Sequence, residues 1–276
     1  MSKKNITVTL IKYIILAVFT ILMIFPLIWL IRSSFMSNTE IFYLPIKWIP
    51  EKLRYENYIE ALTLRPFAVY LKNSVILVVI NVIGVILSCS FAAFGFSRID
   101  FKGRKLWFSL MISTMMIPSS VLLIPQFIEW KTVGAYNTYW PLTVGSFAAP
   151  AFYVFLIRQF FMGIPKEYDE AAFIDGASYL DIYSKIILPL SKPALTAVGI
   201  FTFTSVWNDF FGPLIYLKDD IKYTAALGLQ SFLGYYTGEW NRLMAASTVL
   251  VIPMLIVFFI TQNAFINGIT FSGIKG

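Results

Sequence analysis

The 276-residue sequence is 58% hydrophobic and only 13% charged, with a mean hydropathy of +0.73. Soluble domains are nearer half apolar and a quarter charged, so this composition places most of the chain in lipid. The net charge of +7 does not indicate nucleic acid, because the basic residues are scattered through short loops between apolar runs. Membrane topology explains this distribution better than an acidic ligand does.

Reactive residue types are scarce in this chain. The sequence contains no histidine, which excludes His-based acid–base catalysis, Ser-His-Asp triads and His-ligated metals. The single cysteine, Cys89, lies inside an apolar run, so it forms no intramolecular disulfide, and no zinc-type spacing exists. We therefore predict neither a catalytic residue nor a metal site.

A membrane-spanning helix needs about 20 mostly apolar residues, and six segments satisfy this requirement. They run approximately over residues 11–31, 69–94, 106–127, 139–161, 194–216 and 243–265. The first segment follows two lysines, as a signal peptide would, but it is long and has no small-residue cleavage site, so we expect a retained helix. The sequence thus predicts an all-α, polytopic membrane protein with six transmembrane helices in a single domain, residues 1–276.

The basic residues predict which loops face the cytoplasm, because cytoplasmic loops are enriched in Lys and Arg. Such residues lie in the N-terminal tail and between the second and third spans: Lys3, Lys4, Lys12, Arg98, Lys102, Arg104 and Lys105. Both termini are therefore expected inside. The loops 32–68 and 217–242 carry mixed charge and are expected outside, which places the loop 162–193 in the cytoplasm.

The loop 162–193 is polar and lies between apolar segments, and its sequence predicts two short helices. Gly176 is able to take the left-handed conformation that ends a helix. Ser178, with Asp181 three residues later, resembles a capping box that starts a second helix. Pro189 is expected to end that second helix.

Two interpretations of this loop differ in what its helices contact. They form either a rigid lever that leads into a pore-lining span, or an amphipathic hairpin that lies on the membrane surface. Interfacial helices are usually basic, whereas the first half of this loop carries Glu167, Asp169 and Glu170. The acidic residues favour the lever.

The spacing Glu170-Ala171-Ala172, three residues, Gly176, nine residues, Ile186 and then Leu188-Pro189 resembles a cytoplasmic loop of ABC importers. Through that loop, the permease of a carbohydrate-type ABC importer contacts its ATPase; the maltose, glycerol-phosphate and arabinose-oligosaccharide permeases are such proteins. Further segments similar to this family are Arg158–Phe161, Gly163–Glu167, Trp207–Phe210, Pro213–Leu214, Gly268–Thr270 and Gly273–Gly276. The resemblance extends from about Leu71 to the C-terminus. The chain departs from it at Asn263, where the family commonly has a basic residue, and at Asp209, where Glu often stands.

The resemblance implies a type I ABC importer permease fold and half of a translocation pathway for a sugar or oligosaccharide. Glu170, Ala171, Ala172 and Gly176, with Asp175 nearby, would form a coupling helix that inserts into a cleft of the ATPase. The implied partners are a second homologous permease, two cytoplasmic ATPase subunits, an extracellular or periplasmic sugar-binding protein, the carbohydrate and membrane lipid. The expected location is the bacterial inner (cytoplasmic) membrane.

The chain has no phosphate-binding GxxxxGK[ST] pattern. We therefore expect a transport subunit and not an enzyme, with no cofactor of its own, and with ATP and Mg bound by the partner ATPase.

Trp207, Asn208 and Asp209 form a polar group in the fifth predicted span. An intramembrane charge is costly unless it is paired or hydrated, so Asp209 is a candidate functional residue. A cavity lined by these three side chains would suit a sugar, with hydroxyls bonded to polar groups and a ring face on the indole. Alternatively, Asp209 lies near the outer end of its span, hydrated or paired. Both alternatives stay open.

A secondary transporter or ion channel is the main competing hypothesis. Such a protein would need several intramembrane charges for ion or proton coupling, whereas this chain offers Asp209 alone and no detectable inverted repeat. ABC exporters generally lack the Glu-Ala-Ala motif, so import is the favoured direction.

Overall fold

The computed structural model describes residues 3–233 and 238–270, with side chains described over 8–233 and 238–262. Every regular element within these residues is helical, as predicted. The chain divides into two compact units, Met1–Ala68 with Gly228–Ile252 and Val69–Leu227 with Pro253–Gly276. The predicted tail motif Gly273–Gly276 lies outside the described residues, and so do the side chains of Lys3, Lys4 and Asn263. The expectation of a single domain stays a prediction.

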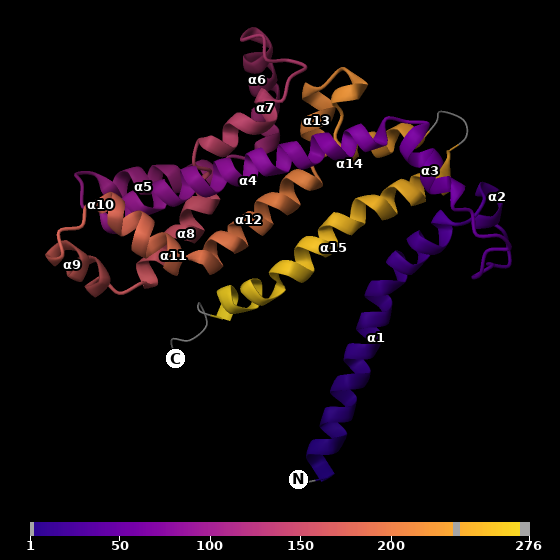
Figure 1. Cartoon of the computed structure of the whole chain (residues 1–276), viewed down its shortest axis with the longest axis horizontal. Helices are drawn as coiled ribbons and strands as arrows, with labels where there is room; N and C mark the ends of the chain where they lie inside the picture. The colour runs from indigo at the N-terminus through magenta and orange to yellow at the C-terminus, as the bar shows by residue number, and fades with distance from the viewer. Residues whose placement is uncertain (1–2, 234–237, 271–276) are drawn as a thin grey trace. The chain divides into compact units, whose positions relative to one another are not determined.

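The first unit contains α1 (Lys3–Ser34), α2 (Asn38–Ile41), α3 (Glu56–Thr63), η5 (Leu229–Phe232) and the first half of α15 (Trp240–Thr270) (Figure 1). Hydrogen bonds join α3 to the start of α15. Asn241 Nδ2 donates to Asn57 Oδ1 at 2.8 Å, and Arg242 Nε lies 2.8 Å from a carboxylate oxygen of Glu60. Residues of the two loops that were predicted outside are therefore in direct contact, and their position outside stays a prediction.

The second unit contains α4 (Phe67–Arg98) from Val69 onward and the other elements. They are α5 (Arg104–Ser113), η1 (Thr114–Met116), α6 (Ser119–Thr132), α7 (Trp140–Thr143), η2 (Val144–Phe147), α8 (Ala151–Gly163), α9 (Glu167–Ile174), α10 (Tyr179–Asp181), the π-helix η3 (Ile182–Ile187), α11 (Leu188–Leu190), α12 (Lys192–Trp207), α13 (Phe211–Tyr216), η4 (Asp220–Lys222) and α14 (Ala225–Gly228). One apolar core joins α4, α8, α9, η3 and α12; its members include Val85, Cys89, Phe94, Val154, Ile157, Phe161, Ala172, Ile182, Ile187 and Val198.

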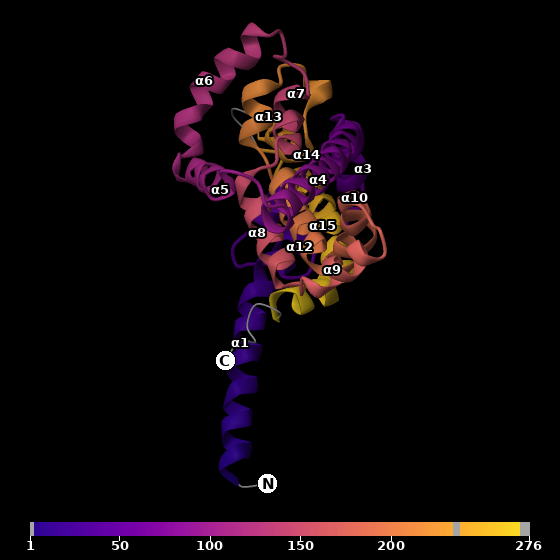
Figure 2. The same cartoon turned by 90° about the vertical axis from the view of Figure 1, so that its left-hand side faces the viewer.

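Among the residues that the structure describes, four helical segments are long and apolar enough to cross a membrane, and the number rises to six if two bent pairs each count as one span. One bent pair joins α5 and η1 to α6 at 96°, as Figure 2 shows. The break between them lies at Pro118, which has an extended backbone (ψ 131°) and directly precedes α6. A proline interrupts a helix because it disfavours a helical conformation of the residue before it and has no N–H to donate. The other pair joins Tyr179–Leu190 to Lys192–Trp207 at 76°.

The fifth predicted span, 194–216, consists of two helices in the structure. α12 ends at Trp207 and α13 begins at Phe211. The carboxylate of Asp209 accepts a hydrogen bond from the Gly212 N–H at 3.0 Å, so it satisfies a backbone donor in the first turn of α13. A Cβ atom at position 212 would collide with that carboxylate. Interactions between neighbouring residues therefore stabilise the break between α12 and α13.

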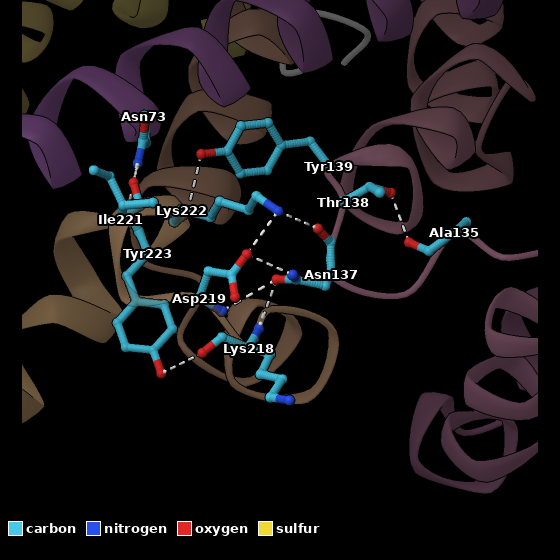
Figure 3. Close-up of polar contacts among 10 residues, drawn as sticks. All are labelled: Asn73, Ala135, Asn137, Thr138, Tyr139, Lys218, Asp219, Ile221, Lys222 and Tyr223. Atoms are coloured by element: carbon cyan, nitrogen blue, oxygen red, sulfur yellow. Dashed lines mark hydrogen bonds and ion pairs between the residues drawn. The ribbon is translucent and has the colours of Figure 1, made fainter.

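A polar cluster at one end of the second unit ties the loop before α7 to the segment after α13 (Figure 3). Asn137 Oδ1 accepts from the backbone N–H groups of Lys218 (3.0 Å) and Asp219 (3.1 Å), and its Nδ2 donates to Asp219 Oδ2 at 2.7 Å. Lys222 Nζ donates to Asn137 O (3.0 Å) and Asp219 Oδ2 (2.9 Å). Asn137 and Lys222 together hold the pKa of the Asp219 carboxyl below its usual range.

The same end of the unit includes the start of α4. Asn73 Nδ2 donates to the carbonyls of Ile221 (2.9 Å) and Tyr223 (3.0 Å) (Figure 3). From Asn73 to Arg98, α4 rises about 37 Å at 1.5 Å per residue, which exceeds the roughly 30 Å hydrocarbon core of a bilayer. The length of α4 is therefore sufficient to place the cluster around Asn137 and the contacts of Arg98 on opposite sides of a membrane.

Substitutions of Asn137 separate the contribution of its side-chain hydrogen bonds to stability from that of its backbone conformation. Asn137 has a left-handed backbone, with φ 60°. We expect Asn137→Gly to destabilise the fold by about 1 kcal/mol through lost hydrogen bonds. Asn137→Ala should cost about 1–2 kcal/mol more, because its Cβ disfavours that conformation. Thermal unfolding of the protein in detergent measures both variants, and equal melting temperatures for the two would contradict the backbone contribution.

Candidate functional site

The helix α9 is defined by local signals at both of its ends. Its first turn carries three acids, which the positive end of the helix dipole favours. At its C-terminus the Gly176 N–H donates to Phe173 O at 3.0 Å and the Ala177 N–H to Ala172 O at 2.9 Å. Gly176 has φ +81°. These are the two bonds of a Schellman motif, and they confirm the prediction that Gly176 ends this helix in the left-handed conformation.

The next helix starts with the predicted capping box. Asp181 N–H donates to Ser178 Oγ at 3.2 Å, and Ser178 N–H donates to Asp181 Oδ2 at 3.1 Å. Lys185 Nζ lies 2.6 Å from the other carboxylate oxygen of Asp181. Hydrogen bonds from Lys185 and Ser178 hold the pKa of Asp181 well below its usual range. The turn between α9 and α10 is thus closed by its own side chains.

The prediction that Pro189 ends this second helix is wrong, because the helix continues through Pro189 to Leu190. The π-helix η3 lies directly before Pro189, and its wide turn relaxes the hydrogen-bond register in which a proline would otherwise be unfavourable. The helix ends at the buried Ser191, whose N–H donates to Ile187 O (3.0 Å) and Leu188 O (3.1 Å). The 76° bend to α12 follows there.

The helix α9 has an inner and an outer face. Asp169 and Ala172 are buried, and Ala172 belongs to the core of the second unit. The exposed residues on and directly after the helix include Glu170, Ala171, Ile174, Asp175 and Gly176, besides Glu167, Tyr168 and Phe173. Four of the five residues expected in the coupling element therefore share an accessible surface, while Ala172 packs against the rest of the chain.

Asp169 faces Arg98, the last residue of α4. Arg98 Nε lies 3.3 Å from Asp169 Oδ2, and the two side chains are only 4% and 12% exposed. Arg98 Nη2 donates to the carbonyls of Phe161 (3.0 Å) and Ile164 (2.8 Å) at the end of α8. Burial raises the pKa of Asp169, while Arg98 and Lys166 oppose that rise. One arginine thus links α4, α8 and α9.

A second arginine makes the reciprocal contact. Arg158 of α8 donates from Nε to the carbonyl of Phe96 in α4 at 3.1 Å, and its guanidinium lies 4.1 Å from the ring centre of Phe108. The last carbonyls of a helix have no partner within the helix. Each of α4 and α8 therefore receives donors from an arginine of the other.

Sequence reasoning used Arg98 only as a marker of topology and assigned no contact to Asp169. A signal for Asp169 does exist, because it precedes Ala172 by three residues and so lies on the same helix face. Which residue of another helix faces it depends on tertiary packing, which the sequence pattern does not specify.

The structure places the three predicted substrate-pathway residues in different surroundings. Trp207 is 1% exposed and stacks on Phe203, with ring centres 5.6 Å apart. Asn208 is exposed and donates to Thr204 O at 2.8 Å. Asp209 bonds to the start of α13, as described above. Their contact with a sugar stays a prediction.

Comparison with known proteins relates most of the chain to one family. The sequence pattern of the family described as "Binding-protein-dependent transport system inner membrane component" matches residues 80–270. The chain is 34% identical over 256 residues to the arabinooligosaccharides transport system permease protein AraQ of Halalkalibacterium halodurans, covering 92% of this chain and 91% of that protein. It is also 34% identical over 275 residues to the trehalose/maltose transport system permease protein MalG of Thermococcus litoralis, covering 96% and 98%.

A solved structure has the same fold. It is the crystal structure of a bacterial ABC transporter involved in the import of the acidic polysaccharide alginate, one chain of which matches with a TM-score of 0.86 at 22% identity. The match covers 96% of this chain and 99% of that chain. The predicted all-α importer-permease fold is confirmed.

Gly176→Ala tests the turn after α9. We expect a loss of about 1–2 kcal/mol, because a Cβ is unfavourable in the left-handed conformation. Gly163→Ala is the matched control, since Gly163 ends α8 without a positive φ and has open space around a Cβ. Amide exchange of residues 167–177 measures the effect. Similar exchange in both variants would show that the backbone of Gly176 does not stabilise this turn.

Proposed function

The chain belongs to the family of inner membrane components of binding-protein-dependent transport systems, and we propose that it forms half of the translocation pathway of an ATP-driven sugar importer. Family membership confirms two predictions from the sequence: the chain is a permease component of an ABC transporter, and it is a transport subunit and not an enzyme. A second, homologous permease would supply the other half of the pathway.

The proposed substrate class is a sugar or oligosaccharide. AraQ and MalG, each 34% identical to this chain over more than nine-tenths of its length, are named for arabinooligosaccharide and trehalose/maltose transport. The alginate importer has the same fold. We propose Trp207, Asn208 and Asp209 as candidate residues of the pathway. Asn208, which is exposed at the break between α12 and α13, is the most accessible of the three.

The single observation that carries the coupling proposal is the accessible face of α9. Ile174 is 87% exposed at the tip of this helix, beside the exposed carboxylates Glu170 and Asp175. An apolar residue between acids fits a protein cleft with a basic rim better than an anionic lipid surface. The inner face is fixed by burial, so a force on the outer face would act on the whole helix.

The proposed orientation places α9 and both termini in the cytoplasm. The basic residues Arg98, Lys102, Arg104 and Lys105 lie at the same end of α4 as α9, which is typical of a cytoplasmic face. The polar cluster around Asn137 would then face outward, toward a sugar-binding protein.

The proposed assembly contains this chain, the second permease, two cytoplasmic ATPase subunits and the binding protein. ATP and Mg would be bound by the ATPase subunits, with no cofactor in this chain. The 18-residue apolar window within Val8–Ser34 has none of its residues buried within the chain, which suits contact with lipid and with a partner.

Affinity purification of the tagged chain from native membranes in mild detergent tests the assembly. We expect a second six-span permease and an ATPase to co-purify. Uptake of labelled maltose, trehalose and arabino-oligosaccharides into vesicles that contain the complex tests the substrate class. Recovery of an intact, folded lone chain or homodimer would contradict the importer proposal and favour a secondary transporter.

Glu170→Lys tests the docking face. We expect ATPase recovery and ATP-driven uptake to fall about tenfold or more, because a reversed charge opposes a basic rim, while membrane insertion is unchanged. Glu167→Lys makes the same charge change on the same helix and should have a smaller effect. Unchanged uptake with Glu170→Lys would contradict docking through this face.

A further inference from the structure

The contact between Arg98 and Asp169 connects the helices α4 and α9. Arg98 ends the long helix α4, which crosses the membrane, and Asp169 lies on the inner face of α9, opposite the exposed residues. The covalent path from α9 to the next span passes through the π-helix η3 and a 76° bend. The polar connection from α9 to α4 is one pair of side chains, Arg98 and Asp169.

We propose that Arg98 is a positioning residue for transport, through which a displacement of α9 by the ATPase is passed directly to α4. This inference rests on the proposed function. It adds a second route of coupling, beside the chain connection from α9 to α12, and assigns that route to Arg98 and Asp169.

Burial makes this ion pair a firm link. With side chains 4% and 12% exposed, neither charge is readily rehydrated where it lies, and separating a buried pair leaves an uncompensated charge at high cost. The exposed pair between Arg104 and Asp100 at the same end of α4 differs, since Asp100 is 86% exposed. Water would replace that contact at little cost.

Arg98 is also held on its other side. Its Nη2 donates to the carbonyls of Phe161 and Ile164 at the end of α8, and the Phe161 carbonyl also accepts the N–H of Ile164 at 3.1 Å. A guanidinium fixed in this way has little freedom to follow Asp169 alone. Movement of α9 would therefore carry the end of α4 with it.

The pair has not made all of its hydrogen bonds. Among the residues that the structure describes, Arg98 Nε and Asp169 Oδ1 are buried without a hydrogen-bond partner, although Nε and Oδ2 are 3.3 Å apart. A small rotation of α9 against α4 would convert this contact into a charge-assisted hydrogen bond. A displacement of α9 would therefore change the interaction energy of this pair, so the position of α9 and the position of Arg98 are coupled.

The test compares Asp169→Asn with the matched control Asp100→Asn in the purified complex with its ATPase, held in nanodiscs. Hydrogen exchange is measured in α9 and in residues 92–98, with and without MgATP and vanadate. The asparagine keeps the shape of Asp169 but removes its charge. We expect nucleotide to change exchange at both places in the wild type and in the control. In Asp169→Asn the change at residues 92–98 should shrink about 2- to 30-fold, while ATPase recovery and the change in α9 persist.

A full nucleotide response at residues 92–98 of Asp169→Asn would overturn the inference. If that variant is poorly recovered, Arg98→Lys provides the same readout, because lysine keeps the positive charge but lacks the guanidinium fork. Its response at residues 92–98 should lie between those of the wild type and Asp169→Asn, and a full response would also overturn the inference. Failure of the wild-type chain to co-purify with an ATPase would instead contradict the proposed function, and the inference with it.

Discussion

The polar groups at the ends of α4 and α8 constrain the structure around the coupling site. A helix that leaves the membrane carries carbonyls without partners, and burying them unpaired is costly. Arg158 donates to α4 and Arg98 donates to α8, so each helix satisfies the other. This exchange holds the ends of α4 and α8 together, and α9 begins only four residues after Gly163.

The short helix α9 is held by the rest of the chain on one face and is accessible on the other. The inner face carries a charge and a small apolar residue, Asp169 and Ala172, which bind it to α4 and to the core. The outer face carries acids and the exposed Ile174, which stay accessible. A helix of 8 residues is too short to be stable alone. Its order therefore depends on the burial of the inner face and on the Schellman turn at Gly176.

Local chemistry explains which features of the site were predictable from the sequence. The turn at Gly176 and the capping box at Ser178 depend on residues within one short segment, and both predictions are confirmed. The helical type of the elements followed from hydropathy, but the division of the fifth predicted span into α12 and α13 did not. The contact between Arg98 and Asp169 was missed, because it joins residues 71 positions apart through tertiary packing. Ala172 was expected among the docking residues, but which face of α9 is buried depends on that same packing.

The contact between α9 and α4 matters because the chain after α9 is irregular. A displacement of α9 that travelled only along the backbone would pass through a π-helix and the bend at Ser191, and irregular turns of this kind often mark hinges. A hinge transmits direction poorly unless a second contact limits its rotation. The buried ion pair supplies such a contact on the opposite side of α9, and α4 carries it across the membrane. Two attachments, one covalent and one electrostatic, would make a short helix act as a rigid lever.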